Sequence, residues 1–310
     1  MKLLDAIARR VPLAVYKPFR IGVVSLRRSS LRRKVCVVVL KLAARAHRGH
    51  LAARLPDVRP LDAPQLVFRS VDSMVMDAVY WFGVKGYEGR VADVWVALCS
   101  RAGAVLEIGG NVGLFTVIGA HACVAPYTVV EPVPAIAAVL HDNLARNGLT
   151  RVEILQAAAI PGTVPTEVTL NIPDEGRSAP VGSHLTEGVE VQGRSSRQRI
   201  RVMGRPFRDL IAGRDLVKID AEGIEAKLLE SARDIILAER PTLLIEILPS
   251  ATQLAALVTE FARAAGYAIH ILPEWGSDTV VTVAADAFTA ALPARFNSKD
   301  IVLSTAALPV

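Results

Sequence analysis

Beyond about residue 89, short apolar runs alternate with longer segments in which apolar residues recur every three or four positions. The short runs predict strands and the periodic segments predict helices. The expected strands are residues 105–108, 128–131, 152–156, 216–220, 243–247, 268–272 and 301–304. The expected helices are residues 89–99, 114–122, 136–147, 224–237 and 252–265. This alternation predicts an α/β fold with a seven-stranded, mostly parallel sheet that includes an antiparallel edge strand.

One stretch departs from the alternation. Residues 161–215 are rich in Gly, Pro and Ser, and they contain the β-type segments 165–172, 187–192 and 199–202. We therefore expect a β-rich insertion before the main sheet resumes. Because Arg177 and His184 lie in this insertion, two interpretations are open: a cover that meets a polar or anionic ligand, or a solvated loop.

The first 60 residues follow a different pattern, in which apolar residues at helical spacing are interleaved with basic ones. The two apolar sets are Leu3, Leu4, Ile7, Ala8 and Val11, and Leu31, Val35, Val38, Val39 and Leu42. This segment has 15 Lys and Arg against two acids, a balance of +13, whereas the other 250 residues have 21 basic and 28 acidic residues, or −7. The pattern predicts a basic, amphipathic helical appendage over residues 1–60.

Two roles fit such an appendage. Residues 1–50 would attach peripherally to an anionic membrane surface, or their helices would pack on the acidic remainder of the chain or on a partner subunit. A membrane span is not expected, because the longest apolar run of the segment, residues 35–40, falls short of the roughly 20 residues that a bilayer requires. Nucleic-acid binding is not expected either, since the basic residues alternate with aliphatic rather than aromatic ones.

The number and spacing of the cysteines indicate the cellular compartment and the metal sites to be expected. The three cysteines, Cys36, Cys99 and Cys123, are odd in number and widely spaced. Neither a disulfide framework nor a zinc site is therefore expected, and a reducing cytoplasm fits. Basic residues also interrupt any signal-peptide core near the start. The sequence leaves the oligomeric state open.

Candidate chemistry begins where the first expected strand runs into a glycine-rich turn, in Val105-Leu-Glu-Ile-Gly-Gly-Asn-Val-Gly113. Glycines in such a turn tolerate positive φ and let a ligand approach the backbone, and the amides that open the next helix favour its negative groups. Glu131 ends the next expected strand. In a doubly wound sheet, two adjacent strands that carry such carboxylates bracket a nucleoside. An ordinary strand–turn–helix with a surface acid is the alternative.

A second cluster of acids follows the later strands. Asp220 ends one strand, Glu222 and Glu225 open the next helix, and Glu246 lies near the end of another strand. Helix capping accounts for part of this cluster. Ligands in open α/β sheets nevertheless bind beyond the carboxyl ends of the strands, and acids gathered there are costly unless a cationic or hydroxyl-rich ligand is bound.

These segments resemble the FkbM family of S-adenosylmethionine-dependent methyltransferases. The resemblance covers about residues 80–305 and rests on Gly86-Tyr-Glu88, Leu106-Glu-Ile-Gly-Gly-Asn-Val-Gly113, Val130-Glu-Pro132, Asp142-Asn-Leu-Ala-Arg-Asn-Gly148, Lys218-Ile-Asp-Ala-Glu-Gly-Ile-Glu225 and Pro241-Thr-Leu-Leu-Ile-Glu246. It implies a Rossmann-like methyltransferase domain over residues 61–310. It also implies methyl transfer, usually to a hydroxyl of a sugar, a glycoconjugate or a natural-product scaffold.

The resemblance and the residues together assign roles to two groups of side chains. S-adenosylmethionine carries a sulfonium, an ammonium, a carboxylate and ribose hydroxyls, for which we expect Glu107, Gly109, Gly110, Asn111, Gly113, Glu131 and Ala158. For the acceptor we expect Asp220 as the general base and Glu222 or Glu246 as positioning groups, with His184 and Glu225 as further substrate residues. His121 is a weaker candidate. A divalent ion is not required by any ligand spacing.

Two other classes of function stay open on the sequence alone. A catalytically silent protein would use the sheet as a binding scaffold and the basic segment for recruitment. A nicotinamide-dependent oxidoreductase would share the sheet and Glu131, but it should show the tighter G-x-G-x-x-G turn, which this chain lacks.

Overall fold

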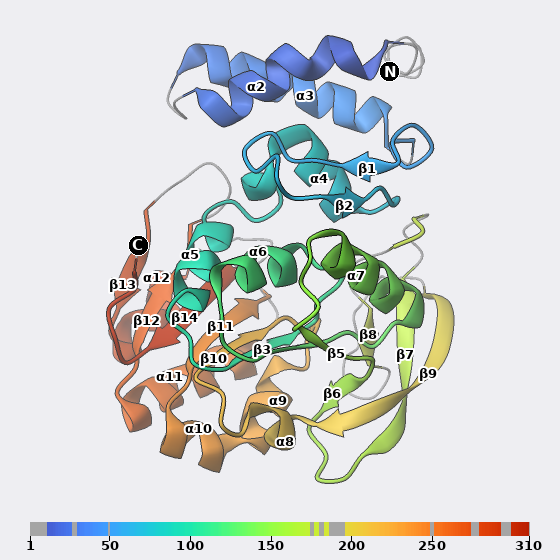
Figure 1. Cartoon of the computed structure of the whole chain (residues 1–310). Helices are drawn as coiled ribbons and strands as arrows, with labels where there is room; N and C mark the ends of the chain where they lie inside the picture. The colour runs from blue at the N-terminus through green and yellow to red at the C-terminus, as the bar shows by residue number, and fades with distance from the viewer. Residues whose placement is uncertain are drawn as a thin grey trace. The chain divides into compact units, whose positions relative to one another are not determined.

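The structure is a computed structural model that describes residues 11–26, 30–48, 50–173, 177–179, 183–185, 196–248, 251–273, 279–292 and 299–309. The chain divides into two compact units (Figure 1). The first comprises Met1–Gly89 with Glu175–Val181, and the second comprises Arg90–Asp174 with Gly182–Val310.

The first unit is mainly helical. Its elements are the 3₁₀ helix η1 (Leu13–Tyr16), α2 (Lys17–Ser25), α3 (Leu31–Ala46), the short antiparallel strands β1 (Asp57–Val58) and β2 (Phe68–Arg69), α4 (Met74–Phe82) and η2 (Val84–Gly86). Serine side chains cap the N-termini of α3 and α4. The Ser30 hydroxyl accepts from Arg33 N at 3.2 Å, and the Ser73 hydroxyl accepts from Met76 N at 3.0 Å. The helix expected around residues 31–42 is thus confirmed, whereas the one expected around residues 3–11 lies almost entirely outside the described residues.

Aromatic packing joins α4 to the helices before it. The ring of Tyr16 meets that of Trp81 edge-on at 5.4 Å, and the guanidinium of Arg20 lies 3.7 Å above the centre of the Tyr80 ring. Trp81 is fully buried, and both this burial and the cation–π attraction between Arg20 and Tyr80 stabilise the unit. The first unit therefore extends to Gly89, beyond the boundary expected near residue 60.

A short piece of the expected insertion also belongs to the first unit. Arg177 is buried there and donates to Asp72 and Asp77, in both cases at 3.0 Å. The amide of Ala179 donates to the Asp72 carbonyl at 3.1 Å. Arg177 therefore balances two partly buried carboxylates, and its guanidinium, 7% exposed, is not the exposed ligand-binding group that one interpretation of the sequence expected.

The second unit is built on an eight-stranded sheet. From edge to edge its strands are β13 (Val281–Val283), β12 (Ala268–Ile271), β14 (Lys299–Ser304), β11 (Thr242–Ile247), β10 (Leu216–Ile219), β3 (Val105–Ile108), β4 (Tyr127–Val130) and β5 (Glu153–Leu155). The strands from β11 to β5 are parallel, and β14 runs antiparallel to both of its neighbours. Chain order reverses between β3 and β10, which is the switch point where doubly wound sheets bind ligands.

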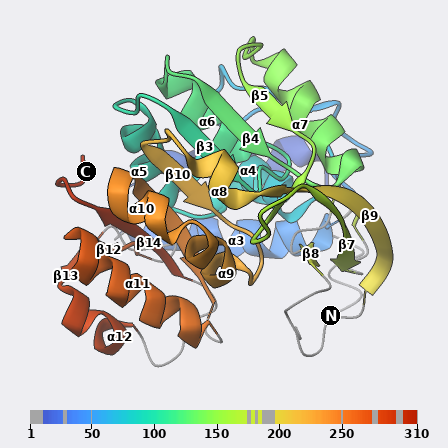
Figure 2. The same cartoon turned by 90° about the horizontal axis from the view of Figure 1, so that it is seen from below.

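Helices cover both faces of this sheet (Figures 1 and 2). One face carries α5 (Arg90–Cys99), α6 (Leu114–Ala122) and α7 (Pro134–Arg146), and the other carries α9 (Glu225–Ser231), α10 (Arg233–Glu239) and α11 (Thr252–Ala265). The short helices α8 (Phe207–Ile211), η3 (Ala285–Ala287) and α12 (Phe288–Ala291) complete the unit. The central strands are buried on both faces, as their continuous apolar runs predict.

The expected insertion forms a second, four-stranded sheet in the order β6-β9-β7-β8. Its strands are β6 (Ala158–Ile160), β7 (Thr166–Pro173), β8 (His184–Leu185) and β9 (Ser196–Pro206), of which β7 and β9 form a long antiparallel pair. The β-rich character expected of residues 161–215 is confirmed. The strand expected at residues 187–192 lies outside the described residues.

The predicted fold class is confirmed, with two differences in the elements. The main sheet has eight strands rather than seven, because the edge strand β13 was not expected. The single helix expected at residues 224–237 is interrupted at Ala232, whose φ of −118° and ψ of 20° are not helical. The Ser231 hydroxyl donates to the Leu228 carbonyl at 2.7 Å, a local bond that competes with helix continuation.

Candidate active site

The carboxyl ends of the parallel strands bring the expected acids to one edge of the main sheet. Asp220 follows β10 and Glu131 follows β4, while Glu107 lies within β3 between them. Because β14 is antiparallel, its first residues Lys299 and Asp300 lie at the same edge, and Asp300 is opposite Glu246 of β11. The sequence predicted that Glu107, Glu131 and Asp220 meet at this edge. The structure places Glu131 and Asp220 there and Glu107 just inside it, within β3.

The glycine turn after β3 has a backbone that only glycine adopts easily at two positions. Gly109 has a φ of +85°, and a Cβ there would lie 2.1 Å from the carbonyl oxygen of Asp220. Gly113 has a φ of +87°, and a Cβ there would lie 2.6 Å from a methyl carbon of Leu140. The turn is therefore fixed by close contact with the residue that follows β10 and with α7.

The amides of this turn are satisfied within the protein. Those of Gly109 and Gly110 donate to the Val130 carbonyl at 2.9 and 3.1 Å, and that of Gly113 donates to the Gly110 carbonyl at 2.9 Å. The Asn111 amide donates to Glu131 Oε2 at 2.8 Å, and the Val112 amide to the Asn111 side-chain oxygen at 2.7 Å. The amides of the Gly109–Gly113 turn are thus already paired. The amides in the first turn of α6, which have no partner within a helix, stay the predicted backbone donors to a ligand.

Glu131 is held at the end of β4 by two backbone donors. Its Oε2 accepts from Asn111 N, and its Oε1 accepts from Val133 N at 2.9 Å. Burial raises the pKa of Glu131 to about 7, against the lowering effect of these two hydrogen bonds. A carboxylate has about four acceptor positions, so Glu131 has acceptor capacity beyond these two bonds, and its contact with a cofactor stays a prediction.

Glu107 is buried inside the sheet rather than lying open at its edge. Its Oε2 accepts a 2.5 Å hydrogen bond from the Tyr127 hydroxyl, and its register partner on β10 is Lys218. Burial raises the pKa of Glu107 to about 7, although the positive charge of Lys218 acts in the opposite direction. Glu107 is thus an internal carboxyl between a phenol and an ammonium.

Lys218 is the cation at the centre of the acids. Its Nζ donates to Asp220 Oδ2 at 2.9 Å and lies 4.9 Å from the centre of the Phe115 ring. Burial raises the pKa of Asp300, and the positive charge of Lys218 again opposes that rise. One buried ammonium therefore faces Glu107, Asp220 and Asp300, which reduces the cost of gathering these carboxylates.

The turn between β10 and α9 is shaped by its own acids. Glu225 is buried, and its Oε1 accepts from Ala221 N at 2.9 Å and from Gly223 N at 3.0 Å. Glu222 has a φ of 54°, in the left-handed region that side chains other than glycine rarely adopt. The structure therefore gives Glu225 a clear function in fixing the turn, and its contact with a substrate stays a prediction.

Two other expected residues lie on the second sheet. His184 is buried in β8, opposite Asn171 of β7, and Ala158 begins β6 opposite Gly204. Their sheet is separate from the one that carries the acids. Their expected contacts with substrate and cofactor stay predictions.

Sequence reasoning missed three members of the site: Lys218, Tyr127 and Asp300. Lys218 had a visible signal, since a lone lysine inside an apolar strand that is buried on both faces needs a nearby anion. The signal for Asp300 was weaker, because its place near Asp220 depends on β14 running antiparallel to β11, which the sequence does not reveal.

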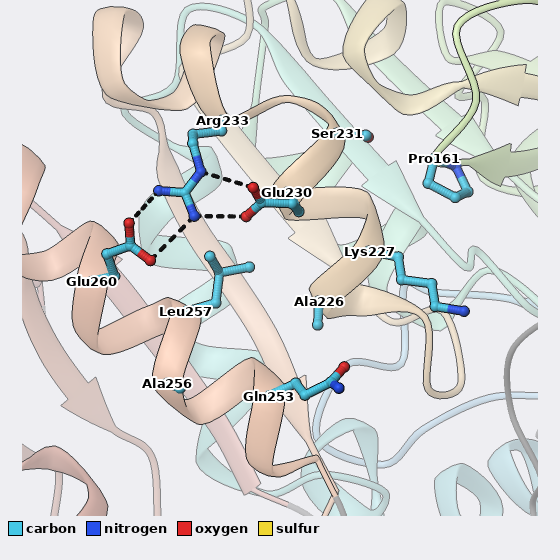
Figure 3. A pocket seen from close by; sticks show the side chains of 10 residues that line it. All are labelled: Pro161, Ala226, Lys227, Glu230, Ser231, Arg233, Gln253, Ala256, Leu257 and Glu260. Atoms are coloured by element: carbon cyan, nitrogen blue, oxygen red, sulfur yellow. Dashed lines mark hydrogen bonds and ion pairs between the residues drawn. The ribbon is translucent and has the colours of Figure 1, made fainter.

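A hollow of about 650 Å³ lies elsewhere, on the helical face formed by α9, α10 and α11 (Figure 3). Its lining includes Lys227 and Leu257, and at one end Arg233 bridges Glu230 and Glu260. None of the strand-end acids lines it, so it is distinct from the candidate site. Among the described residues, no group of three or more metal-ligating side chains is placed to bind an ion.

The fold and the site together define a class: a Rossmann-like sheet with a glycine turn after its first strand and acids at the carboxyl edge around the switch point. The sequence then identifies the family, because a profile described as "Methyltransferase FkbM domain" matches residues 107–269, more than half of the chain. The chain belongs to the FkbM methyltransferase family.

Solved structures with similar folds include three methyltransferases. The FkbM methyltransferase of Methylobacillus flagellatus is 16% identical, with 65% of this chain and 43% of that one covered and a TM-score of 0.41. The SAM-dependent methyltransferase of Agrobacterium tumefaciens is 12% identical, covering 81% and 71% with a TM-score of 0.45. The O-methyltransferase of Bacillus cereus, solved with SAH, is 13% identical, covering 69% and 79% with a TM-score of 0.37. The match spans less than half the length of the Methylobacillus protein, and a comparison with curated proteins found no match.

Proposed function

We propose that the protein transfers the methyl group of S-adenosylmethionine to a hydroxyl oxygen of a sugar, a glycoconjugate or a natural-product scaffold. The observation that carries this proposal is the arrangement of Glu131 and Asp220 at one sheet edge, on either side of the Gly109–Gly113 turn. This edge combines carboxylate oxygens that can accept hydrogen bonds from hydroxyls, negative charge and the N-terminus of α6.

The residues present fit the cofactor by their chemistry. Glu131 keeps acceptor capacity for ribose hydroxyls, and the first turn of α6 suits a carboxylate. The net negative charge of the acid cluster suits the sulfonium and ammonium groups. When bound, the cofactor supplies an electrophilic methyl group on a positively charged sulfur.

On the acceptor side, Asp220 is the proposed general base. Its side chain is 26% exposed, whereas that of its partner Lys218 is 4% exposed, so Asp220 is the end of the pair that meets a ligand. In the proposed step the acceptor oxygen forms a bond to the methyl carbon, the carbon–sulfur bond breaks, and the hydroxyl proton passes to Asp220. Lys218 orients the carboxylate, while Glu222 and Glu246 are proposed to position the acceptor hydroxyls.

Alignment of the two reactants contributes most to the rate. Holding the acceptor oxygen and the methyl group in attack geometry lowers the barrier by roughly 7–11 kcal/mol, whereas a general base typically adds about 10²- to 10⁴-fold. A variant without the base should therefore keep cofactor affinity and lose turnover.

The test combines calorimetry with a methyl-transfer assay on the full chain. We expect S-adenosylmethionine to bind and Glu131→Gln to weaken that binding. Asp220→Asn should affect binding much less than it affects turnover, which should fall about 10²- to 10⁴-fold. Asp286→Asn is the matched control, because Asp286 is a surface acid of the same unit, 81% exposed in its side chain. Candidate acceptors are found by comparing extracts of cells with and without the protein, as metabolites that lack one methyl group when the protein is absent.

Two results would overturn the proposal. Binding of a nicotinamide dinucleotide in place of S-adenosylmethionine would indicate an oxidoreductase. Binding of neither, by a folded protein, would indicate a silent member of the family.

A further inference from the structure

Helix α3 of the first unit presents large apolar side chains to solvent. Leu31, Val35, Val38 and Leu42 follow one another at intervals of four, three and four positions, which places them on one face of the helix. Their exposed fractions are 75%, 51%, 58% and 58%. We refer to these four residues as the α3 stripe.

Three buried side chains hold α3 in the unit. Leu40, Ala43 and Ala46 are buried, and Arg33 Nε donates to the Val23 carbonyl of α2 at 2.8 Å. Helices on the surface of globular proteins usually bury their large apolar residues. In α3 two of the three buried residues are alanines, while the larger aliphatic residues of the stripe face outward.

Basic residues flank the α3 stripe along one side. Lys34, Lys41 and Arg45 follow Leu31, Val38 and Leu42 by three positions each, so each lies beside a member of the stripe. All three are exposed. No acidic residue occurs anywhere between Asp5 and Asp57, so no carboxylate of this segment opposes the attraction of an anionic surface.

Helix α2 lies beside α3 and adds to the same character (Figure 1). Ile21 and Leu26, in and just after α2, are exposed, as is Lys17 at its start. Neither helix crosses a bilayer, because no helix in the described part of the chain is both long and apolar enough.

We propose that the α2–α3 hairpin docks on an anionic lipid surface, with the α3 stripe inserted at the boundary between headgroups and acyl chains. A helix with an apolar stripe bordered by Lys and Arg lies in the plane of such an interface, and the basic residues meet the lipid phosphates. A protein partner fits less well, because the cores of protein interfaces are depleted in lysine.

The test is co-sedimentation of the full chain with vesicles of phosphatidylcholine alone or mixed with phosphatidylglycerol. We expect binding to the mixed vesicles and at least about tenfold weaker partition to phosphatidylcholine alone, because basic segments are attracted by anionic headgroups. The double variant Val38→Ser, Leu42→Ser should weaken binding to the mixed vesicles by at least about tenfold. Lys34→Gln with Lys41→Gln, which removes two of the exposed basic residues beside the stripe, should weaken binding and reduce its dependence on salt.

Matched controls separate docking from general surface properties. Val124→Ser with Val164→Ser removes two exposed valines of the second unit, which are 97% and 65% exposed. Arg201→Gln with Arg205→Gln removes two exposed arginines of the same unit. Both controls should bind vesicles as the unaltered chain does.

Circular dichroism would establish that every variant is folded. The proposal is overturned if the folded, unaltered chain fails to bind the mixed vesicles, or if the stripe variant binds them undiminished. It is equally overturned if the chain self-associates in solution, binds no vesicles, and becomes monomeric in the stripe variant, since the stripe would then be a protein interface.

Discussion

The Lys218 ammonium lies 2.9 Å from Asp220 Oδ2, and the two side chains differ sharply in burial, at 4% and 26% exposed. The buried cation therefore belongs to the interior of the sheet, while its carboxylate partner reaches the edge. Because Lys218 also pairs in register with Glu107, the same ammonium connects the buried acid of β3 to the proposed base after β10. Its removal should affect the whole cluster.

Replacing Lys218 with methionine should destabilise the protein strongly. The change leaves Glu107, Asp220 and Asp300 without their central cation, and breaking a buried ion pair typically costs about 3–5 kcal/mol. Urea unfolding measures the difference. Lys227→Met is the control, since Lys227 is an exposed lysine of α9, and its replacement should change the free energy of unfolding by less than about 0.5 kcal/mol. Equal stabilities of the two variants would contradict the proposed role of Lys218.

Stability should fall as pH rises from about 4.5 to about 7. Burial raises the pKa of Glu107 and Glu131 from 4.5 to about 7 in the folded chain, so between these values the folded state retains protons that the unfolded state has released. The contribution is fully present below the unfolded pKa and is lost on passing the folded one, on the order of 3 kcal/mol per carboxyl.

Urea unfolding at a series of pH values checks this dependence. Glu107→Gln keeps an acceptor for the Tyr127 hydroxyl but removes the titration, so it should flatten the pH profile relative to the unaltered chain. Glu167→Gln is the control, because Glu167 is exposed and its removal should leave the profile unchanged. A Glu107→Gln profile identical to that of the unaltered chain would show that Glu107 does not titrate in this range.

Gly109→Ala should prevent correct formation of the active-site edge. The added Cβ would lie 2.1 Å from the Asp220 carbonyl oxygen, in a residue whose φ is already +85°. Gly148→Ala is a matched control, because Gly148 also has a positive φ, of +67°, but a Cβ there meets nothing within 4 Å. The strained backbone should lower the free energy of unfolding of the control by only about 1–2 kcal/mol. Gly109→Ala should lower it by more and should also abolish S-adenosylmethionine binding. Thermal denaturation and calorimetry distinguish the two, and equal losses would contradict the close approach of β3 and β10.

Arg177→Met should destabilise the first unit. Arg177 is 7% exposed in its side chain and pairs with Asp72 and Asp77, and loss of a buried partner costs about 3–5 kcal/mol. Arg201 pairs with Glu167 on the surface, where it is 78% exposed, so Arg201→Met should cost at most about 1 kcal/mol. Denaturant unfolding of both variants gives the comparison, and a cost for Arg177→Met no larger than that for Arg201→Met would rule out a structural role for this ion triad.

Regular elements were predictable where local signals agreed. The expected bounds of α6 and α11 match the observed ones, because periodic apolar residues and a glycine at one end mark each helix. The edge strand β13 was missed because its three residues are mostly exposed and show no strong alternation. The break between α9 and α10 was missed because the bond from Ser231 to Leu228 leaves no mark in the pattern of apolar residues.

The site was predictable to the extent that it follows from strand ends. Glu131 and Asp220 terminate apolar runs, and the parallel pairing of β10, β3 and β4 brings these strand ends to the same edge of the sheet. Lys218 and Asp300 are separated by about 80 residues of sequence, so their proximity depends on the place and direction of β14 in the sheet. The hydrogen bond from Tyr127 to Glu107 likewise depends on the pairing of β3 with β4.

The ion triad of the first unit has a consequence for synthesis on the ribosome. Asp72 and Asp77 are made roughly 100 positions before Arg177, and until that arginine emerges these two carboxylates lack the guanidinium that bridges them. A nascent chain that ends at Gly89 would thus expose an unfinished polar core, and chaperones that bind incomplete domains should hold it until the later segment arrives.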